Sequence, residues 1–349
     1  MTASSKTPLL ATTGICRTFG SGANSVTALD DVSFHVDPGE TVVLVGESGS
    51  GKTTAARIVL GLDQPGAGTV EIKGTDTSTL SRRRWRDVRR SVQVVLQDPS
   101  SQLNRRHSVQ RIVSGPLLAY GIGDKRSRRA RVIELLGAVG LEESHLKRRP
   151  SELSGGQCQR VAIARALALE PDLVVLDESV SALDVSVQAQ VLNLLKELQA
   201  SHDLSYLLIT HDLAVARYMA HRTYVMFQGR VVESGPTAAV LSDPQHPYTV
   251  NLLKSIVPDQ APTDADVRAA RPDTAEIELD DNDGCRYLAR CAASESPELC
   301  RSERPALAGA DGHLAACHFP TWQRVTMSQP HTDPDPHIDP QIDPETETP

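Results

Sequence analysis

The 349-residue sequence is poor in aromatic residues, which make up 3% of it, and it has no apolar run approaching the roughly 18 residues of a membrane-spanning helix. Its N-terminus lacks the charged and apolar regions of a secretory signal. The formal net charge of −8 argues against a general nucleic-acid binder. We therefore expect a cytoplasmic protein with a core of Val, Leu, Ile and Ala, which reaches a membrane only through partner subunits.

Cysteine is also scarce, with six residues in all. Cys16 and Cys158 stand alone, whereas the other four follow the spacing C-x5-C-x8-C-x16-C at Cys285, Cys291, Cys300 and Cys317. Stable disulfides are rare in the cytoplasm, so this cluster favours a metal site.

The strongest positive signal lies at residues 46–53, which fit the phosphate-binding pattern G-x-x-x-x-G-K-[ST] at every fixed position. The apolar run 41–45 predicts a buried strand before it, and residues 54–60 predict a helix after it. The glycines let backbone N–H groups surround a polyphosphate, Lys52 faces the terminal phosphates, and Thr53 is suited to ligate Mg²⁺. The predicted ATP-binding residues here are Gly46, Glu47, Ser48, Gly49, Ser50, Gly51, Lys52, Thr53 and Thr54.

The flanking segments predict a mixed α/β chain. Alternating apolar residues in 14–40 indicate an antiparallel β-layer, and residues 108–150 carry helical spacing up to Pro150. The basic run 82–90 is typical of a solvated helix face. Residues 92–96 predict a strand, at whose end Gln97 could reach a metal ion or a water.

A second phosphate-binding element is indicated at Ser154-Gly155-Gly156-Gln157, which we expect to open a helix at 161–169. Paired glycines behind a serine leave free N–H groups at a helix start, where the helix dipole also favours an anion. One nucleotide has no obvious use for two such sites in one chain.

Two further apolar runs end in polar residues. The run 173–176 leads into Asp177 and Glu178, and 206–210 leads into His211. Ligands of open α/β sheets bind at the carboxyl ends of parallel strands. Asp177 is therefore placed to hold Mg²⁺ and Glu178 to accept a proton from an attacking water, and a strand hairpin at 223–233 closes this part.

Over residues 9–258 the sequence resembles the ATPase subunits of ATP-binding cassette (ABC) transporters, because all of these motifs occur in that family's order. The resemblance implies a RecA-like P-loop core with an antiparallel β-subdomain and a helical subdomain. It implies that two cassettes form a head-to-tail dimer, in which the signature Ser154, Gly155, Gly156 and Gln157 completes the partner's ATP site. The resemblance implies that Glu178 is the hydrolytic base and that His211 contacts the γ-phosphate. It implies that Gln97 belongs to the Mg²⁺ site and couples it to the membrane subunits. It also implies that Phe19 stacks on the adenine and that Ser181 and Asp184 belong to the D-loop.

Several segments are similar to the oligopeptide, dipeptide and nickel importer branch, including 179–186 and His246-Pro247-Tyr248-Thr249. Residues 97–104 resemble the second ATPase subunit of that branch, although Arg105 stands where Pro is common. Ser179 and Cys158 also depart from common family residues without removing a catalytic group. The resemblance implies a heterodimer with a second homologous ATPase, two permease subunits, an extracytoplasmic binding protein and a place on the cytoplasmic face of the membrane.

The four-cysteine segment resembles the C-terminal module of peptide-importer ATPases, for which a [4Fe–4S] cluster is implied. Four thiolates also suit zinc, and a metal-free module is the remaining alternative. Because the cysteines are remote in sequence from the ATP motifs, we expect a structural or redox-sensing role.

The expected organisation is an ATPase domain at 1–258 with a helical subdomain at about 100–168, a cysteine module at 259–326, and a disordered Asp/Pro-rich tail at 327–349. We expect an ATPase that drives import of di- or oligopeptides. The alternatives are import of nickel, glutathione or another small solute, and a soluble accessory or redox-sensing ATPase.

Overall fold

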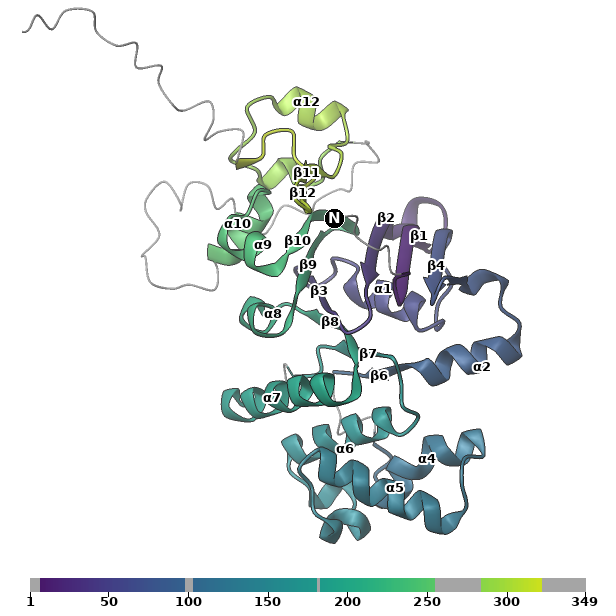
Figure 1. Cartoon of the computed structure of the whole chain (residues 1–349). Coiled ribbons are helices and arrows are strands. Elements are labelled where there is room, and N and C mark those ends of the chain that lie inside the picture. The colour runs from purple at the N-terminus through teal and green to yellow at the C-terminus, as the bar shows by residue number, and fades with distance from the viewer. Residues whose placement is uncertain (1–6, 98–102, 181–182, 255–283, 322–349) are drawn as a thin grey trace, which may run out of the picture.

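The computed structural model describes residues 7–97, 103–180, 183–254 and 284–321. Two β-sheets, a group of helices and a C-terminal module make up this part of the chain (Figure 1). The predictions for Ser181, for residues 98–102 of the segment 97–104, for residues 259–283 and for the tail 327–349 lie outside it. Among the described residues, no helix is both long enough and apolar enough to cross a membrane.

The central sheet has eight strands in the order β11-β12-β10-β9-β3-β8-β7-β6. Five of them are parallel, namely β3 (Thr41–Val45), β6 (Val92–Val95), β7 (Leu173–Asp177), β8 (Ser205–Thr210) and β9 (Arg222–Phe227). The hairpin of β9 with β10 (Arg230–Pro236) turns the sheet antiparallel, as predicted. Every residue of β3 and β8 is buried, in keeping with their wholly apolar or nearly apolar runs.

Helices cover both faces of this sheet. Alternate residues of β3 face opposite sides, so Val43 and Val45 belong to one apolar cluster and Val42 and Leu44 to another. Helix α1 (Lys52–Val59) contributes side chains to the cluster that contains Val42 and Leu44. Helix α7 (Val185–His202) is among the helices that contribute to the cluster with Val43 and Val45. The remaining helices beside the sheet are α8 (Leu213–Met219), α9 (Thr237–Ser242) and α10 (Pro247–Lys254).

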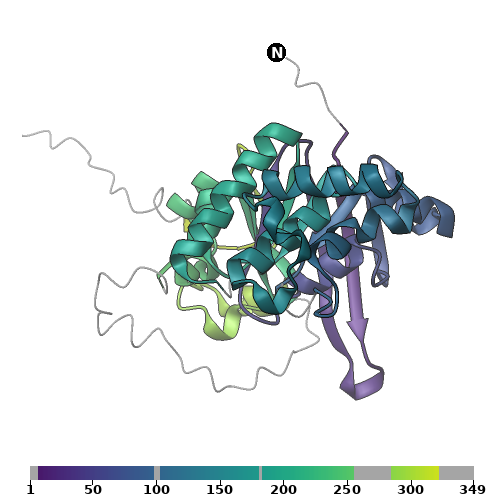
Figure 2. The ribbon, with the colours of Figure 1, turned by 90° about the horizontal axis from the view of Figure 1, so that it is seen from below.

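The smaller sheet is the predicted antiparallel layer. Its order is β2-β1-β4-β5, with β1 (Leu10–Phe19), β2 (Val26–Val36), β4 (Ala67–Ile72) and β5 (Thr75–Asp76). Figure 2 shows the hairpin of β1 and β2 projecting from the body of the molecule. Phe19 ends β1, next to the tip of that hairpin.

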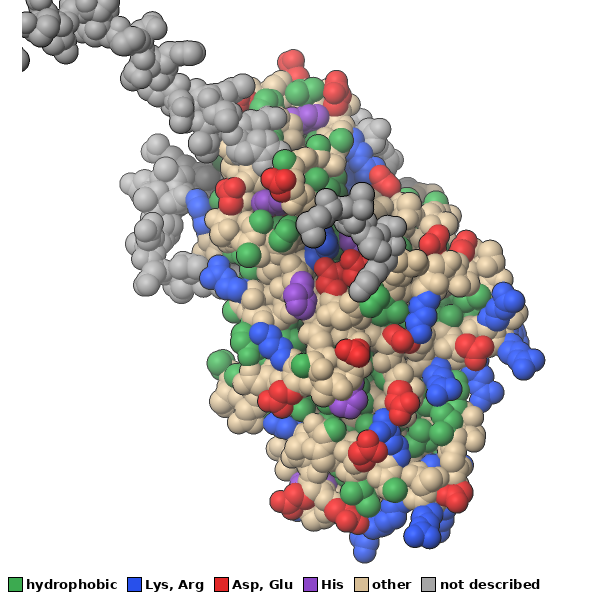
Figure 3. All heavy atoms as spheres, viewed as in Figure 1, with side chains coloured by type: hydrophobic (Ala, Val, Ile, Leu, Met, Phe, Trp, Pro, Cys, Tyr) green, Lys and Arg blue, Asp and Glu red, His purple; other side chains and the backbone are tan. Residues whose placement is uncertain are grey.

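Four more helices follow the small sheet, namely α2 (Arg82–Ser91), α4 (Val109–Tyr120), α5 (Lys125–Ala138) and α6 (Gly155–Leu167). The basic helix α2 buries none of its side chains, as predicted, and blue side chains gather on that flank in Figure 3. The helix expected at 161–169 begins earlier, at Gly155, because Ser154 caps it there. Short 3₁₀ helices lie at Gly22–Asn24, Thr77–Thr79, Glu143–Lys147, Pro150–Glu152 and Leu288–Arg290.

The C-terminal module joins the central sheet. It carries α12 (Pro297–Ser302), β11 (Ala308–Ala310) and β12 (His313–Ala315), and β12 pairs antiparallel with β10 through Glu233 and Ser234. No strand was predicted there, because three-residue strands rich in alanine carry no readable alternation. The module is thus continuous with the central sheet through backbone hydrogen bonds (Figure 1).

The carboxylate of Asp30 on β2 forms ion pairs with three arginines where the module contacts the rest of the chain. Arg230 and Arg286 lie 2.8 and 2.6 Å from it, and Arg304 lies 3.5 Å away. Burial by itself would raise the pKa of Asp30, but the hydrogen bond and charge of Arg230 and the charges of the other two outweigh it, so the pKa is lowered. The ionised carboxylate therefore stabilises the docked module.

Replacing this carboxylate should loosen the module. We expect Asp30→Asn to lower the free energy of unfolding by about 2 kcal/mol, because partly buried guanidinium groups lose their counterion. Urea unfolding at pH 7 measures this. The control is Asp31→Asn, whose carboxylate is 62% exposed and whose change should stay within about 0.5 kcal/mol. Because the native pKa of Asp30 is lowered, its contribution is fully present above the unfolded pKa of about 4. The contribution is lost as the pH falls through the lower native value, so the stabilities of wild type and Asp30→Asn should begin to converge at about pH 4 and meet only below the native pKa. An equal effect of both variants would contradict this account.

Candidate functional site

The predicted catalytic residues meet at the carboxyl ends of three parallel strands. Val45, the last residue of β3, pairs with Thr210 of β8, and Asp177 of β7 pairs with Ile209. Gly46 follows β3, His211 follows β8 and Glu178 follows β7, so all three residues lie at one edge of the sheet. The backbone N–H of Glu178 also donates to the carbonyl of Ile209 at 2.9 Å, which continues the ladder by one bond.

The phosphate loop needs glycine where it passes closest to other backbone. A Cβ on Gly46, which has φ of 149°, would lie 2.1 Å from the carbonyl oxygen of Met226. Gly51 adopts φ of 100° at the N-cap of α1, where a Cβ would lie 2.4 Å from the carbonyl oxygen of Ala28. The loop is therefore pressed against β2 and β9 at these two glycines, and no side chain fits there.

Lys52 is folded into the loop. Its Nζ donates to the carbonyl oxygens of Gly46 and Glu47, both at 2.7 Å, and the residue is only 5% exposed. Burial lowers the pKa of Lys52, while the charges of Glu178, Asp177 and Glu47 oppose that change. The ammonium group is thus held at the site where phosphate oxygens would be received.

Asp177 lies beside the loop. Burial and the neighbouring charge of Glu178 raise the pKa of Asp177, while Lys52 and a hydrogen bond with Thr53 lower it in part. A half-buried carboxylate next to a hydroxyl is suited to a divalent cation, which would restore the ionised form.

Glu178 is held between the two other predicted catalytic side chains. The amide Nε2 of Gln97 donates to one carboxylate oxygen at 2.6 Å, and Nδ1 of His211 lies 3.4 Å from the other. Glu178 has φ of 45°, in the left-handed region that glycine favours. Such a conformation in a non-glycine residue is common where a side chain must be aimed at a functional site.

The other predicted site residues lie apart from this group. Phe19 is 40% exposed with the guanidinium of Arg17 over its ring at 4.8 Å, so it is a surface aromatic rather than a core residue. Ser154 and Gln157 form a capping box at the start of α6, where Ser154 and Gly155 are exposed. Asp184 precedes α7, and its side chain makes no cap hydrogen bond.

The four C-terminal cysteines, although spread over 33 residues, line one pocket together with His246, Ser294 and Phe319. Burial, with nearby cysteines adding to it, raises the pKa of Cys317 to about 11 and also raises that of Cys285. Without a metal, the thiols of Cys285 and Cys317 are therefore protonated at neutral pH. No three of the four sulfur atoms lie mutually within 4.8 Å.

The module lies beside the phosphate loop, although its cysteines are remote from the ATP motifs in sequence. Arg290, which directly precedes Cys291, makes a bidentate ion pair with Glu47 of the phosphate loop at 3.0 and 3.1 Å. Sequence reasoning missed Arg290, and with it Tyr248, whose hydroxyl accepts the N–H of Glu47 at 2.9 Å. Tyr248 did lie in a segment noted for its resemblance to importers.

The same segment is anchored by a wholly buried carboxylate. Glu233 accepts the backbone N–H groups of Gln245 and His246, both at 2.8 Å, and lies 2.7 Å from Nε2 of His313 in β12. Burial lowers the pKa of His246 to about 3, so its ring is neutral. These contacts fix the start of α10, and with it Tyr248, relative to the module.

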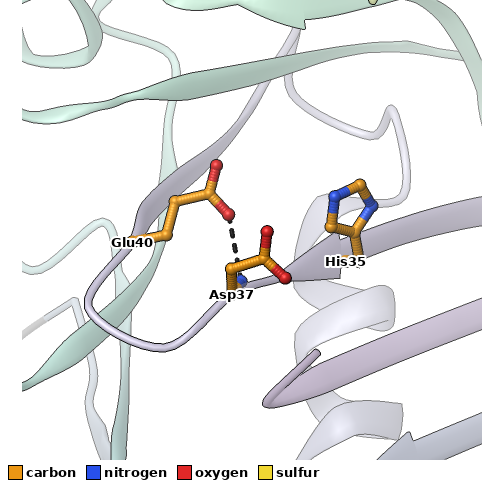
Figure 4. A group of neighbouring side chains, drawn as sticks. All are labelled: His35, Asp37 and Glu40. Atoms are coloured by element: carbon orange, nitrogen blue, oxygen red, sulfur yellow. Dashed lines mark hydrogen bonds between the residues drawn. The ribbon is translucent and has the colours of Figure 1, made fainter. Parts of the chain in front are cut away.

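One cluster outside these sites has the composition of a metal site. It consists of His35, Asp37 and Glu40, the only such group of three with clustered ligand atoms among the described residues (Figure 4). Glu40 already accepts the backbone N–H of Asp37 at 3.0 Å and pairs with Arg222 at 3.1 Å. Nδ1 of His35 lies 3.2 Å from the hydroxyl of Tyr224. These contacts account for the group as a closed turn between β2 and β3.

Comparison with known proteins agrees with this geometry. A family model described as ABC transporter matches residues 29–181, and one described as the C-terminal region of oligopeptide/dipeptide transporters matches residues 232–300. A protein of Sinorhizobium fredii named as a peptide ABC transporter ATP-binding protein is 43% identical over 313 residues, which covers 88% of this chain and 86% of that protein. A peptide import ATP-binding protein of Brucella abortus is 43% identical over 293 residues, covering 84% and 86%.

Solved structures share the cassette. A dimeric ATP-binding cassette in a post-hydrolysis state with ADP and Pi has a TM-score of 0.60 and 32% identity, covering 65% of this chain and 98% of that one. A component of the cbiONQ ABC transporter complex of Clostridium perfringens has a TM-score of 0.61 and 27% identity, covering 71% and 97%. The chain therefore belongs to the ABC transporter family, and the predicted cassette fold is confirmed. Within that family it is an ATPase of the peptide-importer type.

The close approach at Gly46 can be tested against a glycine of similar conformation. Gly49 also has a positive φ, of 80°, but a Cβ there would meet nothing within 4 Å. We expect Gly46→Ala to weaken ATP binding at least about tenfold and to lower the melting temperature, because the loop must move away from β9. Gly49→Ala should cost only the strain of its backbone, about 1 kcal/mol. Fluorescent-nucleotide titration and thermal unfolding measure both, and equal losses in the two variants would count against the steric explanation.

Proposed function

We propose that this chain is the ATP-hydrolysing subunit of an importer for di- or oligopeptides, with Glu178 as the hydrolytic base. The observation that carries the proposal is the grouping of Gln97, Glu178 and His211 at the strand ends beside the phosphate loop. Peptides are favoured over nickel, glutathione and other solutes because both quoted relatives carry peptide in their names.

The proposed chemistry follows from where these side chains lie. Phe19 stacks on the adenine, and Lys52 leaves the loop carbonyls for the terminal phosphates. Glu178 accepts a proton from the water that attacks the γ-phosphate, while Gln97 and His211 hold its two oxygens in a fixed orientation. Mg²⁺, when bound with the nucleotide, would be held by Thr53, Gln97 and Asp177 and would offset phosphate charge.

A second copy of the cassette, its own or a homologous one, completes the proposed site. Ser154 and Gly155 are exposed at the start of α6, a helix that packs on α4 and α5. A capped helix start with free N–H groups suits a phosphate brought by another chain. We propose that Ser154 to Gln157, Ser181 and Asp184 act across a head-to-tail dimer, and that the resemblance of 97–104 to the second-subunit type favours a heterodimer.

The proposed setting is the cytoplasmic face of a membrane, against two permease subunits supplied by an external binding protein. Within the chain we propose an ATPase domain at 1–258 with a helical subdomain at about 100–168, followed by the cysteine module. The redox-sensing or soluble accessory alternative lacks a specific observation in its favour.

The assembled transporter in proteoliposomes tests this function. We expect its ATP hydrolysis to rise several-fold with binding protein and a mixture of di- and oligopeptides, and to stay at the basal rate with nickel or glutathione. Glu178→Gln should lower hydrolysis at least about 100-fold while ATP still binds, because the base is lost and the phosphate loop is intact. Stimulation by nickel or glutathione alone would overturn the cargo, and normal turnover in Glu178→Gln would overturn the base.

We further propose that Cys285, Cys291, Cys300 and Cys317 hold a [4Fe–4S] cluster rather than zinc. Four thiols in one pocket fit the donor set of either group. Structural zinc sites usually begin with two cysteines separated by about two to four residues, whereas five residues separate Cys285 from Cys291. The longer first spacing favours the cluster. The pocket itself is about 10 Å³, so the module would have to fold around such a group.

Metal analysis of anaerobically purified protein tests this assignment. We expect about four irons and four sulfides per chain, with a broad absorption band near ~400 nm. Cys285→Ser should remove the band and most of the iron, because one of four ligands is lost. Cys16→Ser, in β1, is the matched control and should retain both. About one zinc per chain, or no metal, would refute the cluster and leave the ATPase assignment unchanged.

A further inference from the structure

Glu47 of the phosphate loop is held at three points. Its backbone N–H donates to the hydroxyl of Tyr248 at 2.9 Å, and its carbonyl oxygen accepts Nζ of Lys52 at 2.7 Å. Its carboxylate accepts two hydrogen bonds from Arg290, at 3.0 and 3.1 Å. The first and third of these partners lie 201 and 243 residues further along the chain. A single loop residue therefore joins the nucleotide site to the C-terminal module.

Arg290 is itself fixed by the module. Its guanidinium lies over the rings of Phe227 and Tyr287, 5.7 and 5.8 Å from their centroids. Both rings contact Tyr248, with centroids 4.6 and 5.6 Å away. A bidentate arginine resting on aromatic faces has little freedom to turn away. The position of the guanidinium thus follows from the packing of the module against β9 and α10.

The negative charge of Glu47 connects its ion pair with Arg290 to the binding of ATP. A carboxylate in a phosphate-binding loop repels the incoming polyphosphate, and the repulsion is strong where water is partly excluded. Arg290 neutralises that carboxylate, and its bidentate hydrogen bonds keep the side chain turned toward the module. Without Arg290, Glu47 would add a negative charge to the site at which Lys52 must receive phosphates.

We propose that Arg290 is a positioning residue of the nucleotide site, which neutralises and orients Glu47 and so makes ATP affinity depend on the docked cysteine module. The inference needs only the ATPase assignment and holds whether or not the cysteines bind metal. Arg290 stands between Cys285 and Cys291, so opening the module withdraws the guanidinium from the loop.

Equilibrium titration of the full-length protein with a fluorescent ATP analogue tests the proposal. We expect Arg290→Ala to raise the Kd about threefold to tenfold, because the partly exposed pair is worth less than a buried one. Arg290→Lys should fall in between, since lysine keeps the charge and loses the bidentate geometry. The matched control, Arg301→Ala, removes an exposed arginine of the same module and should leave Kd unchanged. In ATPase assays the KM should rise while kcat changes less than about twofold, since Glu178, Gln97 and His211 are untouched.

A second substitution separates charge neutralisation from a damaged fold. In the double variant Arg290→Ala with Glu47→Gln, the unpaired charge is gone, so Kd should return to within about twofold of Glu47→Gln alone. A misfolded module would not be rescued in this way. Wild-type affinity in Arg290→Ala, or a double variant as weak as Arg290→Ala, would overturn the proposal. Failure of the wild type to bind the analogue would instead refute the ATPase assignment.

Discussion

The in-register parallel pairing of β3, β8 and β7 is the constraint on which the nucleotide site depends. Because Val45 pairs with Thr210 and Asp177 with Ile209, the phosphate loop, His211 and the two carboxylates leave the sheet at the same level. A shift of one residue in any of the three strands would turn its apolar side chains to the wrong face and carry its catalytic residue away from the others. The buried sheet and the chemistry are therefore specified by the same register.

A second constraint operates beside the first, where one tyrosine connects three parts of the chain. Tyr248 packs on Phe227 of the sheet and on Tyr287 of the module, and its hydroxyl accepts the N–H of Glu47. Burial raises the pKa of Tyr248, which keeps this hydroxyl neutral. The segment beginning at His246 thereby acts as a platform between the module and the phosphate loop, and the buried Glu233 holds that platform in place.

The nucleotide site could be predicted from sequence because its residues follow local rules. A glycine-rich loop after an apolar strand, and carboxylates at a strand end, carry their meaning within about ten residues. The contact of Arg290 with Glu47 could not be predicted in this way, because it spans 243 residues and neither residue is unusual in its own segment. The same holds for Asp30 and its arginines. The predicted start of α6 was wrong by six residues. The helix was expected to begin after the paired glycines, whereas the Ser154 cap offsets their low helix propensity and the helix begins at Gly155.

The separation of these contacts along the chain has a consequence for biosynthesis. Asp30 leaves the ribosome early, but its arginine partners follow 200, 256 and 274 residues later. At about 5–20 residues per second, the last of them is made on the order of 14–55 s after the carboxylate. Arg230 of β10 can pair with Asp30 before the module is made, but Arg286 and Arg304 at Asp30, and Arg290 at Glu47, are added only when the module emerges. A nascent chain therefore acquires its full set of nucleotide-loop contacts only when translation is nearly complete.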